Sequence, residues 1–400
     1  MLKKMMLKHK LIAGFVAVGL MPILLIAVVV INMASSSIEQ LAFNQLESVQ
    51  IIKKSQIISY FNQRMGDAKM FSQMPFIENA IEELNLLNKQ AADNNFKGRN
   101  VLRYEPYKRV YDKYLKFIKS YMETYGYYDI FLFAPGTGRV LLTVVLESDF
   151  ATDMKDESHS LARAWQEANR NNKSVMTAME PYAPSFGAPA MFMVVPIIKG
   201  GKNIGAIGMQ IPNDQINGIM LERSGMGRTG ETYLVGKDKL MRSDSYLTPN
   251  THSVKESFKG NVENNGVNTI ASNKALAGED GREIITDYTG NQVLSVYGPV
   301  SFFGITWALI AEIDRDEALT SSISMTNFSI IVGIIILMLV IAIGIFISRN
   351  IKPLFMLADK LEVLTSKEGN LSEKLPESGN NEIGILAKLF NKFIESLHFM

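Results

Sequence analysis

Two uncharged, strongly apolar runs constrain this chain more than any other feature of its sequence. Residues 11–31 and 328–348 are each 21 residues long and contain no Asp, Glu, Lys or Arg. A helix of that length spans about 30 Å, the hydrocarbon thickness of a bilayer. The first run is too long for the apolar part of a cleaved signal peptide, and no cleavage site of small residues follows it. We therefore predict two transmembrane helices with a separately folded region between them.

Basic residues predict the orientation of the two spans. Four lysines lie within residues 1–10, directly before the first run. Arg349 and Lys352 follow the second run, whereas its other flank, residues 312–317, is net acidic. Because short loops rich in Lys and Arg stay in the cytoplasm, we predict that both termini are cytoplasmic and that residues 32–327 lie outside.

Composition excludes several functional classes. The net charge is only +1, which disfavours nucleic-acid binding, since such proteins usually carry a strongly basic face. The chain has no cysteine, so it contains neither a disulfide nor a thiolate metal site. Hydrophobic residues make up 47% of the chain, which is enough for a packed core outside the two spans.

Catalytic and cofactor motifs are absent from the sequence. Its four histidines are His9, His159, His252 and His398, and none has a second metal-type ligand at helical or hairpin spacing. There is neither a Gly-x-Ser-x-Gly elbow nor a Walker-type loop. We therefore expect no catalytic residue, no metal and no cofactor, and a protein that is not an enzyme.

A long helix is predicted to lead out of the first span. Residues 23–65 contain neither Gly nor Pro, and apolar residues such as Leu46, Val49 and Ile52 recur at helical spacing. The helix is expected to continue to about residue 72. Its apolar side either packs on its own domain or forms the spine of a dimer, and both alternatives stay open.

The outside region is predicted to contain a duplicated α+β module. Val195-Pro196 in one half matches Gly298-Pro299 in the other, and Phe131 precedes Pro196 by 65 positions as Tyr233 precedes Pro299 by 66. Matching order and spacing indicate an internal duplication, with an antiparallel sheet and covering helices in each copy. The expected strands of the first copy are 128–133, 140–145, 190–195 and 204–211, with a helix at 158–170 and a hairpin turn at 199–202 (Lys-Gly-Gly-Lys). Those of the second copy are 232–235, 240 onward, 292–300 and 304–313.

This organisation resembles the double-Cache sensors, in which two PAS-like modules sit on a long helix that leaves the membrane. The residues 226–233 (Met-Gly-Arg-Thr-Gly-Glu-Thr-Tyr), with Met-Arg-Ser-Asp at 241–244, resemble the opening of the membrane-proximal module of bacterial chemoreceptors. The resemblance implies a distal module at about 73–214 and a proximal module at about 225–313. It also implies a multi-pass protein of the bacterial inner (plasma) membrane, with its sensor in the periplasm or outside the cell.

The segment after the second span, residues 349–400, resembles a HAMP relay domain. Pro353 follows the membrane, Gly-Asn-Leu at 369–371 forms a connector, and Glu-Ile-Gly at 382–384 opens a second helix. Apolar residues repeat at alternating spacings of three and four along both helices, a pattern that pairing into a parallel four-helix bundle would bury. We therefore expect a homodimer; an amphipathic helix on the membrane surface is the weaker alternative.

The distal module is expected to bind a small molecule. Arg163, Trp165 and Tyr182 match the amino-acid-binding pattern of double-Cache receptors, whereas Gln166 replaces a Tyr and Gln210 stands where that pattern has an Asp. Because Gln lacks the charge that an ammonium group requires, the resemblance favours a small carboxylate or another polar organic molecule. A purely structural role stays open for each of these residues: Trp165 would then be part of the core, and Arg163 would be a solvated helix residue. The candidate ligand-binding residues are Phe131, Arg163, Trp165, Gln166, Tyr182 and Gln210.

The expected function is that of a transmembrane chemoreceptor of the methyl-accepting chemotaxis type. Three alternatives stay open: the sensor part of a histidine kinase, the sensor part of a nucleotide or diguanylate cyclase, and a binding or decoy receptor without output. A chemotaxis coupling protein and a histidine kinase are expected partners only if an output domain follows residue 400.

Overall fold

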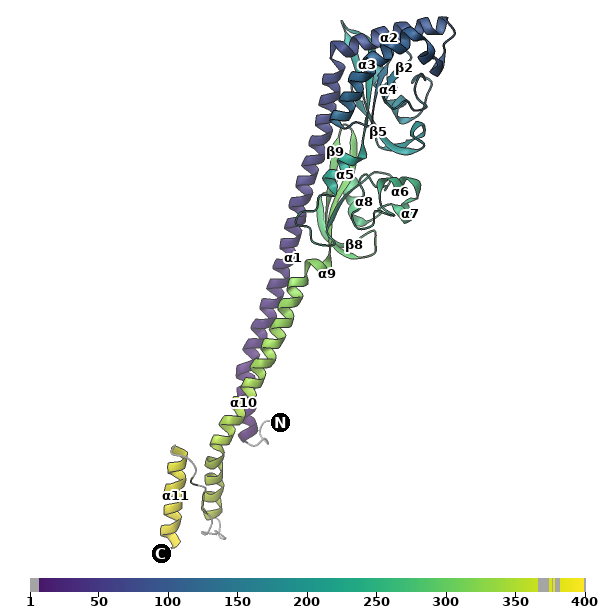
Figure 1. Cartoon of the computed structure of the whole chain (residues 1–400). Helices are drawn as coiled ribbons and strands as arrows, with labels where there is room; N and C mark the ends of the chain where they lie inside the picture. Colours follow the sequence, from purple (N-terminus) through teal and green to yellow (C-terminus); the bar gives the residue numbers. More distant parts are fainter. Residues whose placement is uncertain (1–6, 366–373, 376, 378–381, 399–400) are drawn as a thin grey trace. The chain divides into compact units, whose positions relative to one another are not determined.

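The computed structural model describes residues 7–365, 374–375, 377 and 382–398 (Figure 1). The chain forms two compact units. Residues 39–318 make up the sensor unit, and residues 1–38 with 319–400 make up the membrane and relay unit.

The helix α1 (Leu7–Ser72) confirms the predicted long helix, and its residues 39–72 pack with one side on the rest of the sensor unit. The Phe61 ring stacks on Phe302 at 3.9 Å and meets Trp307 edge-on at 5.6 Å, so the helix contacts the proximal module directly. Lys53 is buried, and its ammonium group donates to the carbonyl of Glu222 between the two modules (2.8 Å). Of the two alternatives for the apolar side of this helix, packing on its own domain is therefore observed.

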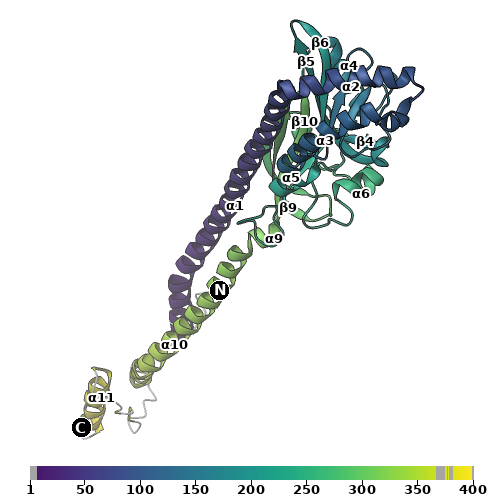
Figure 2. The same cartoon turned by 45° about the horizontal axis from the view of Figure 1, so that its top comes forward.

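The distal module contains a mixed set of helices around one antiparallel sheet (Figures 1 and 2). The strand order is β2-β1-β6-β5-β3, and β4 pairs with β5. Helices α2 and α3 pack against β1, β2 and β6, while α4 packs against β3, β5 and β6. The elements are α2 (Pro75–Asp93), the short helix η2 (Gly98–Arg103), α3 (Glu105–Tyr125), β1 (Asp129–Phe133), β2 (Val140–Thr143), α4 (Ser160–Asn171), β3 (Val175–Met176), β4 (Glu180–Tyr182), η3 (Ala183–Ser185), β5 (Ala188–Lys199), β6 (Lys202–Ile211) and α5 (Asn213–Met220).

A glycine pair sets the register of the longest hairpin in this module. Gly200 and Gly201 adopt positive φ values of 57° and 78°, which a two-residue type I′ turn requires at both central positions. Lys199 pairs with Lys202 across the turn, as the sequence predicts.

The proximal module repeats the distal sheet with fewer strands. Its strand order is β7-β10-β9-β8, so in each module the first strand pairs with the last, and the last with the one before it. The matched prolines occupy equivalent places, since Pro196 pairs with Ala206 and Pro299 with Ala308. This confirms the duplicated α+β architecture. The elements are β7 (Glu231–Val235), α6 (Val254–Lys259), α7 (Val262–Asn265), α8 (Ile270–Leu276), β8 (Gly281–Thr286), β9 (Gln292–Phe302) and β10 (Ile305–Asp314).

Two details of the proximal module differ from the prediction. The return strand expected from residue 240 onward is reduced to one bridge, between Val235 and Met241. The chain leaves the sheet there because the Ser243 hydroxyl, in place of a backbone carbonyl, accepts the hydrogen bond of the Leu234 amide (3.0 Å). The edge strand β8 was not predicted; it lies beside β9.

The sensor unit ends in a short hydrogen-bonded junction. After β10 the helix α9 (Arg315–Ala318) precedes α10 (Thr320–Thr365). The Glu317 carboxylate accepts hydrogen bonds from the amides of Arg228 (2.7 Å) and Thr229 (2.8 Å) and from the Thr229 hydroxyl (2.6 Å). The Thr229 hydroxyl oxygen in turn accepts the amide of Asp314 (3.1 Å). The start of the proximal module is thereby tied to the segment that leaves it.

Helices with the length and composition of membrane spans lie at residues 17–72 and 326–347, and residues 17–38 of the first belong to the membrane and relay unit. Within the relay, α11 (Glu382–His398) buries Phe390, while Leu386 and Phe393 stay exposed. Asn391 bonds both the amide and the carbonyl of Leu375 at 2.8 Å. The predicted connector at 369–371 lies outside the described residues.

Candidate ligand-binding site

Strand pairing brings five side chains of the distal module onto one face of the sheet. Asp129 of β1 pairs with Gln210 of β6, which also pairs with Phe192 of β5. Phe131, two residues after Asp129, pairs with Thr143 of β2. Residues directly opposite in a sheet, and those two apart along a strand, project to the same face. The sequence therefore places an acid, an amide and a hydroxyl among aromatic side chains there.

Asp129 is fully buried at the start of β1. One of its oxygens accepts hydrogen bonds from the amides of Ile130 (2.7 Å) and Val144 (2.8 Å), and the other accepts from the Thr143 hydroxyl. Burial raises the pKa of Asp129 to about 7, although these hydrogen bonds oppose the shift, and repulsion from Asp149 adds to it.

Asp149 is the second buried carboxylate, in the loop after β2. Its Oδ2 accepts the Tyr182 hydroxyl at 2.6 Å, at the end of β4. Burial raises the pKa of Asp149 to about 6, and the hydrogen bond from Tyr182 limits this rise. The Tyr182 ring packs edge-on against Phe192 (4.7 Å) and His159 (5.1 Å), so this carboxylate adjoins the same sheet face.

Three buried oxygens in this region have no hydrogen-bond partner among the residues that the structure describes. They are Asp149 Oδ1, Gln210 Oε1 and Ser160 Oγ. Ser160 is the first residue of α4 and follows His159, which packs on Tyr182. Buried polar atoms are nearly always paired, so unpaired acceptors mark a place where a donor is missing.

A short loop covers this cluster and carries an exposed aromatic residue. The Ser185 hydroxyl donates to the Glu147 carboxylate, which also accepts the Tyr128 hydroxyl (3.1 Å). Phe186 follows with a left-handed backbone (φ 55°) and a fully exposed ring. The loop from Tyr182 onward is thus held over the sheet by hydrogen bonds to Asp149 and Glu147.

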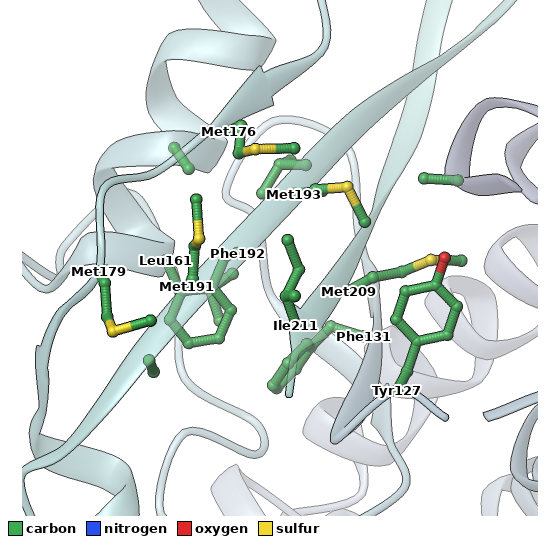
Figure 3. Close-up of a cluster of buried hydrophobic side chains, with 14 of the residues drawn as sticks. Tyr127, Phe131, Leu161, Met176, Met179, Met191, Phe192, Met193, Met209 and Ile211 are labelled. Carbon is green, nitrogen blue, oxygen red and sulfur yellow. The ribbon is translucent and has the colours of Figure 1, made fainter. Parts of the chain in front are cut away.

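The apolar neighbourhood of the cluster is rich in methionine. Figure 3 shows Phe131 and Phe192 within a buried group that includes five methionines from β3, β5, β6 and the segment before β4. Four of these methionines lie on the opposite face of the sheet from Phe192, because Met191 and Met193 alternate with it along β5, and Met193 pairs with Met176 and Met209. The group contains Met176, Met179, Met191, Met193 and Met209.

Three of the six predicted site residues come together in this cluster. Phe131, Tyr182 and Gln210 lie on the sheet face or against it, as described. The sequence reasoning missed Asp129 and Asp149. An aspartate that opens an entirely apolar strand was the available signal for Asp129, whereas nothing local distinguishes Asp149 from a solvated loop residue.

The other three predicted residues lie apart from the cluster. Arg163 is exposed, pairs with Glu180 and donates to the Ser158 carbonyl (2.6 Å). Trp165 is buried against Gly138 in the turn between β1 and β2. The Gln166 amide donates to the backbone carbonyls of Met154 (2.9 Å) and Glu157 (3.1 Å) and so fixes the loop before α4.

A second buried acidic pair lies in the proximal module. Glu231 of β7 stands opposite Glu312 of β10 in the ladder. Glu312 accepts the hydroxyls of Tyr233 (2.6 Å) and Ser295 (2.7 Å), and burial raises its pKa to about 8. Burial also raises the pKa of Glu231, which accepts the Tyr288 hydroxyl. Every oxygen of this pair has a hydrogen-bond donor, in contrast to the distal cluster.

Comparison with known families identifies the class of protein. Residues 34–322 match the Cache domain family and residues 346–399 match the HAMP domain. The chain belongs to the Cache domain family, as a double-Cache sensor followed by a HAMP domain. Helices with the length and composition of membrane spans flank the sensor.

Its relatives include methyl-accepting chemotaxis proteins. PctB of Pseudomonas aeruginosa is 23% identical over 260 residues, which cover 62% of this chain and 37% of PctB. McpA of Pseudomonas putida is 24% identical over 241 residues, covering 59% of this chain and 35% of McpA. The chain therefore spans little more than a third of the length of these curated relatives.

Solved sensor domains are also similar. The ligand-binding domain of the Pseudomonas fluorescens chemoreceptor CtaA, in complex with L-leucine, is 14% identical with a TM-score of 0.40; the match covers 71% of this chain and 99% of that domain. The sensory domain of the Campylobacter jejuni chemoreceptor Tlp3 is 11% identical with a TM-score of 0.46; the match covers 72% of this chain and 99% of that domain.

Proposed function

We propose that this chain is the sensing and relay part of a transmembrane chemoreceptor of the methyl-accepting chemotaxis type. The observation that carries the proposal is the order of its parts: a Cache sensor between two membrane-length helices, followed directly by a HAMP domain. A sensor built in this way serves to pass a signal across a bilayer. The proposed location is the bacterial inner membrane, with the sensor outside, and the chain has no enzymatic activity of its own.

The proposed ligand site is the buried cluster of the distal module. Asp129, Asp149, Tyr182 and Gln210 combine polar groups with aromatic walls, which is the composition of small-molecule sites. The sequence favoured a small carboxylate or another polar organic molecule. Because two buried carboxylates already occupy the cluster, repulsion disfavours a carboxylate ligand, and the proposal retains the second class.

The proposed signal path runs through hydrogen bonds between the modules. Asn217 of α5 bonds Asp244 of the proximal module twice, through its amide group and its carbonyl oxygen, each at 2.8 Å. The β7–β10 ladder then leads to Asp314, and Glu317 ties the outgoing segment to Thr229. A change in the distal module thereby acts on the helix that enters the membrane.

Pairing of two copies is part of the proposal. Leu386 and Phe393 are exposed on α11, and so is Ile52 on α1. An amphipathic helix whose apolar residues remain uncovered is stabilised by packing against another copy. We propose a homodimer, which would control a histidine kinase through a coupling protein when an output domain is attached.

A binding screen tests the proposed site. The full chain, in lipid nanodiscs, is heated with amines, amino acids, carboxylates and purines, and its unfolding temperature is recorded. A ligand at about 100 times its dissociation constant adds about 2.7 kcal/mol of stability. We expect a stabilising ligand whose effect is lost in Asp149→Asn and retained in Glu180→Gln, a control at the surface. A ligand whose effect survives Asp149→Asn would place binding elsewhere.

A further inference from the structure

We infer that the distal cluster binds a small organic cation with a primary ammonium group, held by Asp149 and Gln210, and that it does not require a ligand carboxylate. This inference names the ligand class of the proposed site and so rests on the proposed function. Its support comes from the unpaired acceptors, the charge, the arginines and the lining of the cluster.

The unpaired atoms are all acceptors of hydrogen bonds. Asp149 Oδ1 and Gln210 Oε1 are buried without a donor, and Ser160 Oγ accepts as readily as it donates. Asp149, Gln210 and Ser160 are 2%, 5% and 2% exposed, so these oxygens are shielded from bulk solvent. A primary ammonium group brings three N–H donors, and its charge strengthens each bond to a carboxylate.

The charge of the site also favours a cation. Asp129 and Asp149 are close enough to repel each other, and Glu147 stands at the covering loop. The titratable and charged side chains that act on the two aspartates are Tyr182, Tyr111, Glu147 and Arg99. His159 packs on Tyr182, and burial lowers the pKa of its ring. The cluster is therefore mainly acidic, and Arg99 is the cation that opposes the rise in the pKa of Asp149.

Nearby arginines are engaged elsewhere. Arg99 donates to the carbonyls of Leu146 and Glu147, and Arg139 pairs with Asp153. Arg163, the residue that the resemblance assigned to a ligand carboxylate, pairs with Glu180 at the surface. Among the residues that the structure describes, none of these three donates to Asp129 or Asp149. A carboxylate on the ligand would therefore meet the carboxylates of Asp129, Asp149 and Glu147, opposed by Arg99, which already donates to two backbone carbonyls.

The walls of the site suit the carbon skeleton of an alkyl or aromatic amine. The rings of Phe131, Phe192 and Tyr182 lie together. Aromatic faces attract a cation and offer an apolar surface to its carbon skeleton. Entry requires the loop from Tyr182 to Phe186 to lift, which breaks the hydrogen bonds to Asp149 and Glu147.

A matched set of probes tests the ligand class on the full chain in nanodiscs. n-Butylamine, n-butanol, butyrate and γ-aminobutyrate share a four-carbon skeleton and differ in their end groups. We expect calorimetric binding of n-butylamine, weaker binding of γ-aminobutyrate, and none of the other two. Asp149→Asn retains the acceptor for Tyr182 and removes the charge, and it should weaken amine binding about 10- to 100-fold. Glu180→Gln, an exposed control, should bind as the parent does.

The pH dependence supplies a second readout. Because burial holds the pKa of Asp149 near 6, an ammonium that pairs with the ionised carboxylate displaces its proton. Amine binding should therefore release protons and weaken as the pH falls below 6, and Asp149→Asn should reduce this dependence to the part that Asp129 contributes. Binding of amine that is independent of both pH and Asp149 would overturn the assignment of the ammonium to this residue.

The outcomes separate the ligand class from the receptor function. If butyrate or butanol binds better than n-butylamine and Asp149→Asn abolishes that binding, the inference is overturned while the distal site stands. If no probe binds, the amine class is overturned. Amine binding that Asp149→Asn abolishes, without any effect on membrane output, would contradict the proposed receptor function instead.

Discussion

Glu312 makes a strong prediction about pH, because it is fully buried opposite Glu231. Burial raises its pKa from an ordinary value of 4.5 to about 8, and repulsion from Asp287 and Glu231 adds to this shift. The carboxyl group is therefore largely protonated at neutral pH. The perturbation that removes its titration is Glu312→Gln, which retains a neutral group of similar shape.

The magnitude follows from the difference between the two pKa values. Each pH unit corresponds to about 1.4 kcal/mol, so the difference amounts to about 5 kcal/mol. The folded state binds the Glu312 proton more tightly than the unfolded state does. The contribution of this proton to the free energy of unfolding is therefore fully present below pH 4.5 and is lost as the pH rises through 8. The free energy of unfolding of the sensor should fall over this range, and Glu312→Gln should remove up to about 5 kcal/mol of that fall.

Denaturant unfolding of residues 39–318 between pH 5 and 8.5 measures this difference. Asp129 and Asp149 also have raised pKa values and produce a decrease of the same sign, so the comparison is between the parent and the variant at each pH. Glu283→Gln is the matched control. Its hydrogen bond from Lys274 lowers the pKa of Glu283, which stays ionised throughout. If Glu312→Gln leaves the pH dependence unchanged, Glu312 is ionised in the folded sensor and the reasoning is refuted.

Two further predictions concern packing and the junction. Gly138→Ala places a methyl group 2.5 Å from the Trp165 ring at a positive φ of 68°, so it should lower the free energy of unfolding of the sensor by about 1–3 kcal/mol. In the control Gly136→Ala the methyl group meets nothing within 4 Å, so only the strain of its positive φ should lower the stability. Denaturant unfolding compares the two variants. Glu317→Ala removes three hydrogen bonds to residues 228–229, so the Thr229 amide should exchange faster with deuterated water, while the exchange of β1 stays unchanged.

The features that the sequence predicted well depend on local chemistry. The membrane-length runs can be recognised from their length and lack of charge alone. The Gly200-Gly201 hairpin can be recognised from the residue types that its turn requires. The duplication was readable because Pro196 and Pro299 keep their places in two copies of one sheet. The edge strand β8 lacks such a landmark, so its pairing with β9 depends on the folded module.

The ligand site was only partly predictable, for physical reasons. Arg163 and Trp165 are two positions apart on α4, and about 200° of rotation separates their side chains. Because Trp165 is buried against Gly138, Arg163 must face solvent, and this was foreseeable from helical geometry alone. The burial of Asp149 was not foreseeable, since it arises when the loop after β2 meets Tyr182 from a distant part of the chain.

The central claim is that ligand binding in the distal module changes the helix that enters the membrane, and that the Glu317 junction transmits this change. It is tested most directly in a chimeric receptor. Residues 1–400 are joined to the kinase-control domain of a characterised chemoreceptor, and kinase activity in membrane vesicles is measured with n-butylamine. We predict that the parent responds, that Asp149→Asn loses both binding and response, and that Glu317→Ala retains binding but loses the response. A full response in Glu317→Ala would contradict the proposed path, and a full response in Asp149→Asn would contradict the proposed site.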